Sequence, residues 1–399
     1  MKYKSKIIVA LSSLIFTIPI LSACASTNPK VITFALSENY FGLSATKSLQ
    51  KELLTEIKKI KTTDSKYSNV LLEQINVRKI EDSSTKLQEI NANKVQFAFV
   101  PTYQVFKSGV KDFDIVLQTE TDAFKGDETL SYYSPTNNPL EKVAQALNDN
   151  FSNPAYKTWF GKNSQKKEIE VKEKDQKVEG TNTKNWNGIR YNDIYANPRK
   201  LVPFYRGMIM IYGTDEQLKQ IKDAWNKKDW NAFKKFGIAG GKTSSAGKFV
   251  LQELLLKKHF NNAFTTLEEE KLKDKNFKLL TGQSGSNIGW TNLKDYHIFF
   301  DDESSYAWTQ NNTTNDQHFY TPQVANTKAE VFMVTNPMGY DLGIFNKSIA
   351  KPVQQIISQA FINLAKANKD PYGPLGGYNG YSFVSQKNLD DFQNKTLKV

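Results

Sequence analysis

Cysteine and histidine are both scarce in this chain of 399 residues, which holds one Cys and three His. With Cys24 alone, no internal disulfide can form. The histidines, His259, His297 and His318, are scattered and show no metal-ligand spacing such as H-E-x-x-H. The segment TGQSGSNIG also lacks a G-x-S-x-G nucleophile elbow, because Ser286 stands where the last glycine is needed. These absences predict that the protein is not an enzyme and holds no catalytic metal.

Long apolar runs are missing too, except at the N-terminus. The chain opens MKYKSK, continues with the apolar run IIVALSSLIFTIPI and then reads LSAC. This run is too short for a spanning helix and, with its lysines, is typical of a secretory signal. The segment 21–24 resembles the lipobox of bacterial lipoproteins, in which the cysteine is acylated after cleavage. We therefore expect lipidation of Cys24 and an extracellular protein anchored to the cell membrane by lipid.

The charge balance is basic, at +12 for the whole chain. Removal of residues 1–23 takes away three lysines and no acid, which leaves +9. Such a surface suits an anionic ligand, an anionic membrane face or nucleic acid. In the densest charged run, 166–180, the signs alternate, which is typical of a solvated segment rather than a nucleic-acid arm. We expect no nucleic-acid partner.

Strand and helix patterns alternate along the chain, which predicts an α/β protein. A capping box is expected where Thr214 precedes Gln217 by three residues, and Pro352 suits the first turn of a last helix. The alternation occurs in two units, each expected to form an open parallel sheet with helices on both faces. The expected strands are 31–36, 74–80, 95–100, 207–213, 296–300 and 329–334, and the expected helices begin near 44, 83, 214, 249 and 352.

Two facing α/β units predict a two-domain solute-binding protein, with the ligand cleft between the two open sheets, at the carboxyl ends of the strands. We expect residues 1–23 to be the lipoprotein signal peptide. Residues 24–125 would form the first part of domain 1. Residues 126–332 would form domain 2, with an insertion around 126–200, and residues 333–399 would return to domain 1.

The segment GIAGGKTSSAGK (237–248) resembles a nucleotide-binding loop but has the wrong spacing. A P-loop needs four residues between its first glycine and the Gly-Lys pair, and Phe236 stands where that glycine would be. At the start of a helix, the hydroxyls of Thr243, Ser244 and Ser245 and the unpaired N–H groups could instead hold a phosphate or pyrophosphate. The alternative is an ordinary helix capped by Ser or Thr.

Aromatic residues crowd the other loops that follow strands, beside Gly and Pro. They are either core residues at domain edges or stacking platforms for a flat ligand. Carboxylates near aromatic faces would also suit a cationic ring. Arg206 could contact an anionic ligand or pair with a neighbouring carboxylate. Apart from the hydroxyl residues of 243–245, the candidate ligand-binding residues are Ser37, Glu38, Tyr40, Tyr205, Arg206, Tyr306, Trp308, Asn336, Tyr340, Asp341 and Tyr378.

Several long strings resemble the mycoplasmal extracytoplasmic thiamine-binding lipoproteins, also described as high-affinity transport system lipoproteins. They include FYRGMI (204–209), DAWNKKDWNAFKKFGI (223–238), FINLAKANKDPYGPL (361–375) and GYNGY (377–381). The resemblance runs from the lipobox to about residue 381. It implies a two-domain, type II periplasmic-type solute-binding fold. It also implies a protein that takes thiamine or thiamine diphosphate between its domains and delivers it to a membrane permease and ATPase. It implies no cofactor other than this transported ligand.

Two other functions remain open from the sequence. The segment TSSAG also resembles the anion loop of phosphonate-binding proteins, so a phosphonate or phosphate-ester receptor of the same fold is one alternative. A surface adhesin that binds a host protein or anionic polymer through a basic face is the other. Aromatic density favours the thiamine receptor over the first, and the paired α/β units favour either receptor over the adhesin.

Overall fold

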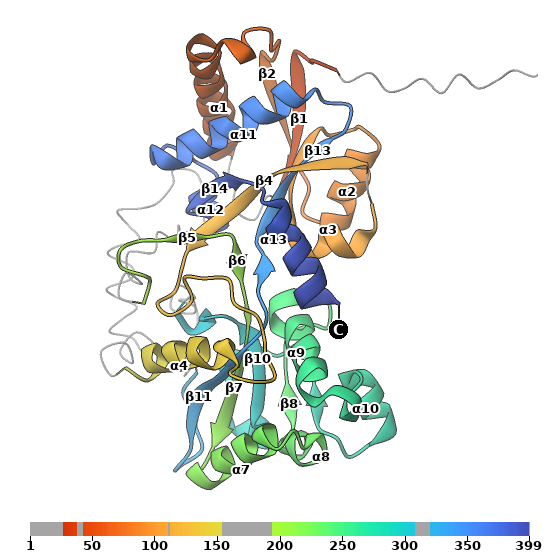
Figure 1. The fold of residues 1–399 in the computed structure, drawn as a ribbon, viewed down its shortest axis with the longest axis vertical. Coiled ribbons are helices and arrows are strands. Elements are labelled where there is room, and N and C mark those ends of the chain that lie inside the picture. The colour runs from red at the N-terminus through yellow and green to blue at the C-terminus, as the bar shows by residue number, and fades with distance from the viewer. Residues whose placement is uncertain (1–26, 38–42, 111, 154–193, 308–319, 399) are drawn as a thin grey trace, which may run out of the picture.

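The computed structural model describes residues 27–37, 43–110, 112–153, 194–307 and 320–398. They form two lobes, one above the other in Figure 1, each built on its own β-sheet. Within these residues, no helix combines the length and apolar character that crossing a membrane would require. The predicted lipidation site, Cys24, lies outside the described residues.

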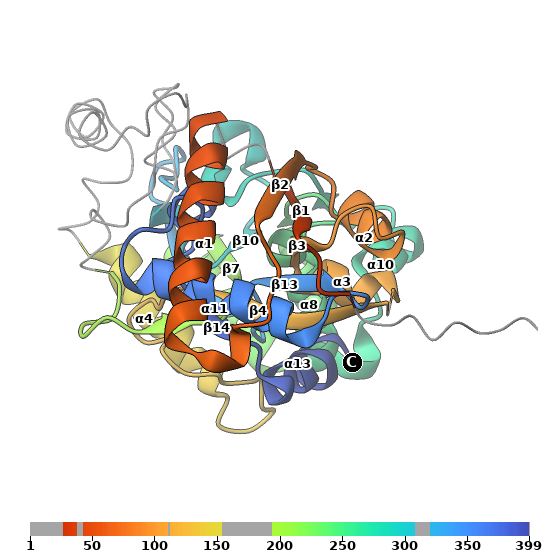
Figure 2. The same ribbon diagram turned by 90° about the horizontal axis from the view of Figure 1, so that it is seen from above.

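The sheet of the first lobe has the order β14-β4-β13-β3-β1-β2. Strand β1 pairs in parallel with β2 and β3, whereas β13 and β14 run antiparallel to their neighbours. Helices α1 (Leu43–Thr63) and α11 (Lys351–Lys366) pack together over one face, as Figure 2 shows from above. Helices α2 (Ser83–Asn91) and α3 (Thr102–Ser108) lie on the other side. The strands are β1 (Val31–Leu36), β2 (Gln74–Lys79), β3 (Phe97–Pro101), β4 (Phe113–Asp122), β13 (Asp341–Asn346) and β14 (Gly380–Phe383).

The sheet of the second lobe has the order β11-β7-β10-β8-β9. Strand β7 runs antiparallel to both of its neighbours, and β8 is parallel to β10 and β9. Its strands are β7 (Gly207–Gly213), β8 (Ile238–Ala239), β9 (Leu279–Leu280), β10 (Ile298–Asp302) and β11 (Lys328–Val334). Its helices are α4 (Pro139–Ser152), α7 (Asp215–Asn226), α8 (Trp230–Phe233), α9 (Leu251–Phe260) and α10 (Leu267–Lys273).

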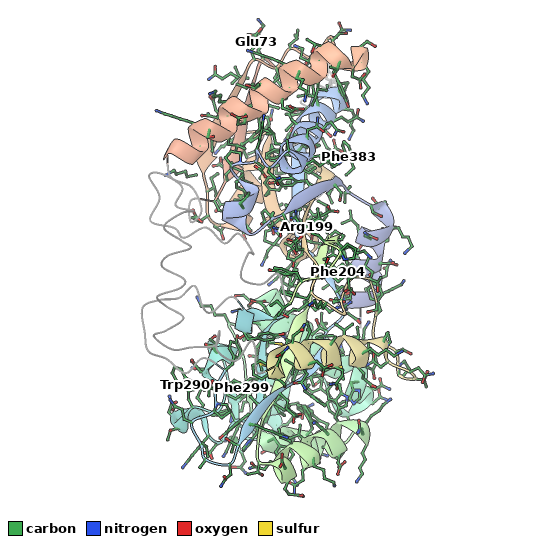
Figure 3. All side chains as sticks on the ribbon, turned by 90° about the vertical axis from the view of Figure 1, so that its left-hand side faces the viewer. Glu73, Arg199, Phe204, Trp290, Phe299 and Phe383 are labelled. Atoms are coloured by element: carbon green, nitrogen blue, oxygen red, sulfur yellow. The ribbon has the colours of Figure 1, made fainter. Side chains whose placement is uncertain are left out.

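The chain crosses between the lobes at a narrow waist (Figure 1). There β6 (Phe204–Tyr205) pairs antiparallel with β12 (Met338–Gly339). The chain passes through β6 from the first lobe into the second, and it returns through β12 from the second lobe into the first. The C-terminal segment, α13 (Gln386–Asp391) and the π-helical turn η11 (Phe392–Leu397), packs beside this pair. A small apolar cluster, which includes Phe204, Leu251, Met338 and Phe392, fills the waist. Figure 3 shows Phe204 between the two lobes.

Most of the expected elements are present. Strand β7 matches the prediction at both ends, and Thr214 and Gln217 form the predicted capping box. The expectation of wholly parallel sheets is wrong, because chain segments that enter from the waist run against the others. Strand β5 (Leu201–Val202) pairs with β4 and therefore extends the first sheet, although it falls within the range expected for domain 2. The domain boundaries themselves stay a prediction.

Candidate functional site

The strand ends that face the waist come from both sheets. In the first sheet, Asp341 at the start of β13 lies opposite Pro101 at the end of β3. In the second sheet, Asp302 at the end of β10 lies opposite Gly207 at the start of β7. Because β6 and β12 connect to these same ends, the two edges lie next to the crossing between the lobes. Ligands of open α/β folds bind at such carboxyl edges.

The edge of the first sheet carries a buried lysine and a partly buried carboxylate. Lys86 donates from Nζ to Ser37 Oγ at 2.8 Å and to the carbonyl of Phe99 at 3.2 Å. Tyr378 donates from its hydroxyl to Asp341 Oδ2 at 2.7 Å. Burial raises the pKa of Asp341, which the Tyr378 hydrogen bond and the charge of Lys86 partly offset. Three predicted ligand residues, Ser37, Asp341 and Tyr378, are thus connected to one edge.

Two tyrosines approach each other where the waist strands reach this edge. The rings of Tyr205 and Tyr340 lie 5.3 Å apart between centroids and are tilted by 39°. The Tyr340 hydroxyl accepts a hydrogen bond from Thr121 Oγ1 at 2.9 Å. Burial raises the pKa of both phenols, so they are neutral at any physiological pH. Both side chains keep partial exposure and can offer a ring face to a ligand.

A pocket of about 590 Å³ opens beside Tyr378. Asp122 at the end of β4 and Asn379 directly before β14 line it together with Tyr195 and Arg199 from the crossing segment. Arg199 donates from Nε to Asp122 Oδ1, and Figure 3 shows it at the waist. The pocket has the volume of an ordinary small-molecule site. Tyr378 is the predicted residue that connects it with Asp341.

On the second sheet, the hydroxyl-bearing loop leads from β8 into the π-helical turn η5 (Ala246–Val250) and α9. Thr243 and Ser244 are exposed, and Ser245 is the N-cap residue without a capping bond from its side chain. Within the described part of the chain, the hydroxyls of Thr243, Ser244 and Ser245 make no hydrogen bond. The start of this helix therefore offers open donors, as an anion site requires.

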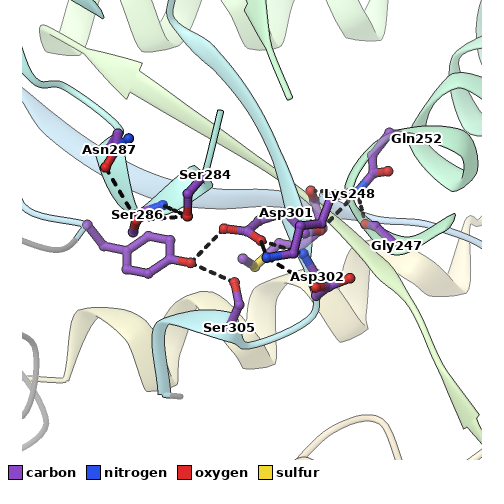
Figure 4. Close-up of polar contacts among 11 residues, drawn as sticks. Gly247, Lys248, Gln252, Ser284, Ser286, Asn287, Asp301, Asp302 and Ser305 are labelled. Carbon is purple, nitrogen blue, oxygen red and sulfur yellow. Dashed lines mark hydrogen bonds and ion pairs between the residues drawn. The ribbon is translucent and has the colours of Figure 1, made fainter. Parts of the chain in front are cut away.

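Charged groups lie directly behind this loop (Figure 4). Lys248 Nζ lies 3.2 Å from Asp301 Oδ1 and 3.4 Å from Asp302 Oδ2. Burial raises the pKa of Asp302 to about 6, although Lys248 opposes this shift. Asp301 also accepts a hydrogen bond from the Tyr320 hydroxyl at 2.6 Å. The described residues contain no group of three or more His, Cys, Asp or Glu side chains that could hold a metal ion.

Arg206 was predicted to contact the ligand, and the structure corrects this. Its side chain is 0% exposed and all its donors serve the protein itself. Two of them bind Asp127, from Nε to Oδ2 at 2.7 Å and from Nη2 to Oδ1 at 2.9 Å. The remaining donors bind the carbonyls of Ser131 and Thr335 and the Ser131 hydroxyl. Arg206 thus closes an internal ion pair at the waist, which was the alternative left open from the sequence.

Two more predicted ligand residues belong to the protein interior. Tyr306 is fully buried in the core of the second lobe and donates to the carbonyl of Leu147 at 3.1 Å. Asn336 accepts from the N–H of Tyr133 at 2.6 Å and donates to the carbonyl of Lys395 at 2.7 Å, so it anchors the C-terminal segment. Glu38, Tyr40 and Trp308 lie outside the described residues.

Sequence reasoning missed Lys86 and Asp302 as parts of the site region, and it missed Asp127 as the internal partner of Arg206. Lys86 sits on a helix in which a lysine is ordinarily solvated, so its burial has no local signal. Asp302 belongs to an acidic triplet, 301–303, of the kind that is ordinarily solvated. Its position at the carboxyl edge of a strand was the available signal, because such residues line ligand sites in open sheets.

Comparisons with known proteins agree with this architecture. The model of the extracytoplasmic thiamine-binding lipoprotein family, CypI, matches residues 47–397. The high affinity transport system protein p37 of Mycoplasma pneumoniae is 37% identical over 323 residues, 78% of each chain. The p37 protein of Mesomycoplasma hyorhinis is 35% identical over 387 residues, which cover 93% of this chain and 88% of that one.

A solved structure gives the same result. The Mycoplasma hyorhinis protein Mh-p37, described as a proposed thiamine pyrophosphate transporter, superposes with a TM-score of 0.73 at 33% identity, covering 94% of this chain and 98% of that chain. The predicted α/β solute-binding fold is confirmed. The relatives are transport proteins, in agreement with the prediction that the chain is not an enzyme. From these similarities, the chain belongs to the family of extracytoplasmic thiamine-binding lipoproteins.

Proposed function

We propose that this protein is the substrate-binding lipoprotein of an ABC-type importer and binds thiamine or thiamine diphosphate between its lobes. Its anchor would be a lipid on Cys24, on the extracellular face of the cell membrane. One observation carries the proposal. Polar groups without a partner among the described residues stand at the edges of both sheets beside the waist, a carboxylate oxygen of Asp341 on the first sheet and the hydroxyls of 243–245 on the second.

The ligand's three parts match these groups chemically. Thiamine diphosphate carries an aminopyrimidine, a cationic thiazolium and an anionic tail. The aromatic faces of Tyr205, Tyr340 and Tyr378 suit the rings, and Asp341 suits an amino group or a cation. The helix start behind Ser245 suits the phosphates, because its N–H groups are unpaired and its dipole attracts negative charge.

The proposed mechanism is closure of the two lobes over the ligand. A ligand that contacts both sheet edges binds the closed form better than the open form and shifts the population toward it. Bending at the β6 and β12 crossing would bring the edges together. The permease and its ATPase would then recognise the closed form and accept the ligand.

Calorimetric titration with thiamine, thiamine monophosphate and thiamine diphosphate tests the proposal. We expect binding that tightens with each phosphate, and a double variant Ser244→Ala/Ser245→Ala that loses this gain but still binds thiamine. Equal affinity for all three compounds would support a thiamine receptor in which residues 243–245 only cap the helix and do not bind phosphate. Absence of binding to all three would reject thiamine as the ligand.

The hydroxyl loop alone would also serve a receptor for a phosphonate or phosphate ester that has no ring. Titration with methylphosphonate and a sugar phosphate distinguishes the two functions. Tight binding of these compounds, without binding of thiamine, would favour this second receptor. Failure of both classes of ligand would leave a surface adhesin as the remaining function.

A further inference from the structure

Lys86 is an unusual residue at the edge of the first sheet. It is 3% exposed, although lysine is almost never fully buried without a partner of opposite charge. Among the described residues, no carboxylate lies within ion-pair distance of its ammonium group. Asp341, Glu81 and Asp82 act on it only from further away, and burial lowers its pKa. A fold that keeps such a costly group at a ligand-facing edge has a use for it there.

The ammonium group determines how Ser37 can be used. An ammonium can only donate hydrogen bonds, so Ser37 Oγ must accept the bond of 2.8 Å from Lys86. The second donor of Lys86 is fixed on the carbonyl of Phe99 at 3.2 Å, which prevents the side chain from rotating away. The hydroxyl hydrogen of Ser37 makes no bond with another described residue. One lone pair of Ser37 Oγ is thus occupied by Lys86, and the O–H hydrogen of Ser37 is available to a ligand.

Asp341 provides the complementary group. Its Oδ2 accepts from Tyr378, whereas Oδ1 has no hydrogen bond with the described residues. The positive charge of Lys86 opposes the effect of burial and favours the carboxylate. A carboxylate can only accept. In the sheet, Ser37 follows β1 and Asp341 begins β13, with β3 between them, so one donor and one acceptor stand on either side of β3.

We propose that Lys86 is a positioning residue that fixes this donor and acceptor pattern, and thereby selects an aminopyrimidine. A ring nitrogen would accept from Ser37, and the adjacent amino group would donate to Asp341. In a 4-oxo pyrimidine the two positions are reversed, which sets a carbonyl against the carboxylate and removes the ring acceptor for the Ser37 O–H. This inference rests on the proposed function, and it extends that function by naming the part of the ligand that is recognised and the residue that enforces the choice.

The test compares thiamine with oxythiamine, its 4-oxo analogue, by calorimetric titration. We expect the wild-type protein to prefer thiamine by about 10-fold or more, because a site built for one hydrogen-bond pattern rejects the other. Lys86→Met should bring this ratio close to one, because Ser37 then loses the contact that holds its hydroxyl in place and Asp341 loses the nearby positive charge that favours its carboxylate form. Lys86→Arg should retain much of the preference. Lys94→Met, at an exposed lysine of the same lobe, is the matched control and should leave the ratio unchanged.

Ser37→Ala provides a second variant, since it removes the donor while the charge of Lys86 stays in place, and it should lower the ratio as well. Melting temperatures of all variants show whether each is folded. A ratio that survives in Lys86→Met and Ser37→Ala overturns the inference, and thiamine binding by the same variants leaves the proposed function intact.

A fragment of thiamine tests the role of Lys86 separately from the proposed function. The compound 4-amino-5-hydroxymethyl-2-methylpyrimidine and its 4-oxo analogue can be compared by ligand-observed NMR. If thiamine and its phosphates fail to bind, the proposed function falls. Selective binding of the amino fragment, lost in Lys86→Met, would still support the inference, and equal or absent binding of both fragments would overturn it.

Discussion

Arg206 illustrates how a single side chain at the waist is committed to the fold. Its partner Asp127 is itself buried, and Glu303 accepts from the Arg206 N–H at 3.1 Å through Oε2. Burial, and then repulsion by Asp127, raises the pKa of Glu303 well above its usual range. The group thus joins the Arg206–Asp127 ion pair with a third ionisable side chain at the same buried place. Such a group holds together only while both charged partners remain.

We therefore predict that Arg206→Ala lowers the free energy of unfolding by about 3–5 kcal/mol, because it leaves the charge of Asp127 buried without a partner. Arg199→Ala is the matched control, since the Arg199 side chain is 57% exposed in its pair with Asp122 and should cost less than about 1 kcal/mol. Urea-induced unfolding measures both. If Arg206→Ala has normal stability but no longer binds ligand, Arg206 contacts the ligand and the prediction is wrong.

A second prediction concerns Asp302, whose pKa burial raises to about 6. In the unfolded chain an aspartate has a pKa of about 3.9, so between these values the folded protein holds a proton that the unfolded chain has lost. The contribution of Asp302 to stability therefore falls as the pH rises from about 4 to about 6. Relative to Asp302→Asn, the wild-type protein should lose stability over this range. Urea unfolding of the two proteins at several pH values measures this, and a constant difference would contradict it.

At the residue scale, the sequence shows which loops are rich in polar and aromatic residues, but it does not show whether a given side chain is buried or exposed. Tyr306 and Asn336 stand in loops as rich in polar and aromatic residues as the loops of Tyr340 and Tyr378. The structure buries the first two in internal hydrogen bonds and leaves the other two partly exposed at the edge. The direction of a side chain depends on contacts with distant segments, such as Leu147 and Lys395, which no local pattern reveals.

At the scale of elements, the helix after the hydroxyl loop starts where backbone and side chains approach closely. A Cβ atom on Gly247 would lie 2.0 Å from Asp302 Oδ1 and 3.2 Å from Tyr205 Cε2. Glycine is thus needed here to let the helix start approach Asp302 and the waist. In this loop, which resembles a nucleotide-binding motif, the glycine at 247 is explained by close packing.

Gly247→Ala should therefore destabilise the protein by about 1–3 kcal/mol, as overpacking of a close contact does. Because the closest clash is with Asp302, Asp302→Ala should recover much of this loss when both changes are combined. Unfolding measurements on the two single variants and the double variant give the coupling energy. Additive effects would show that the strain arises elsewhere in the loop.

The elements that the sequence predicted have strong local signals. Strand β7 is a continuous apolar run, and α7 begins with a capping box. Strands β4 and β13 were not predicted, since β4 ends in the polar residues TETD and β13 contains Gly343, and both depend on pairing with distant strands. The antiparallel direction of β7 could not be predicted either, because it follows from where the chain enters the second lobe.

At the scale of the whole molecule, the two lobes have separate cores but share the waist cluster. The large core of the second lobe and the cores on the two faces of the first sheet contain no residue in common. The waist cluster joins Leu251 of α9 with Met338 of β12 and Phe392 of the C-terminal segment. Thr396 Oγ1 also donates to the carbonyl of Pro337 at 2.7 Å. The C-terminal segment thus ties the second lobe to the crossing strands.

Phe392→Ala should weaken this tie and so separate the unfolding of the two lobes. Phe392 is fully buried, and its truncation should cost about 3–5 kcal/mol. Because the loss falls on the contact between lobes and each lobe keeps its own core, we expect thermal unfolding to split into two transitions in calorimetry. Gln393→Ala, at the exposed neighbouring position, should unfold as the wild type does. A single transition shifted to lower temperature in Phe392→Ala would instead show that the lobes remain one cooperative unit, held together by the β6 and β12 crossing and the Arg206 ion pair without the C-terminal segment.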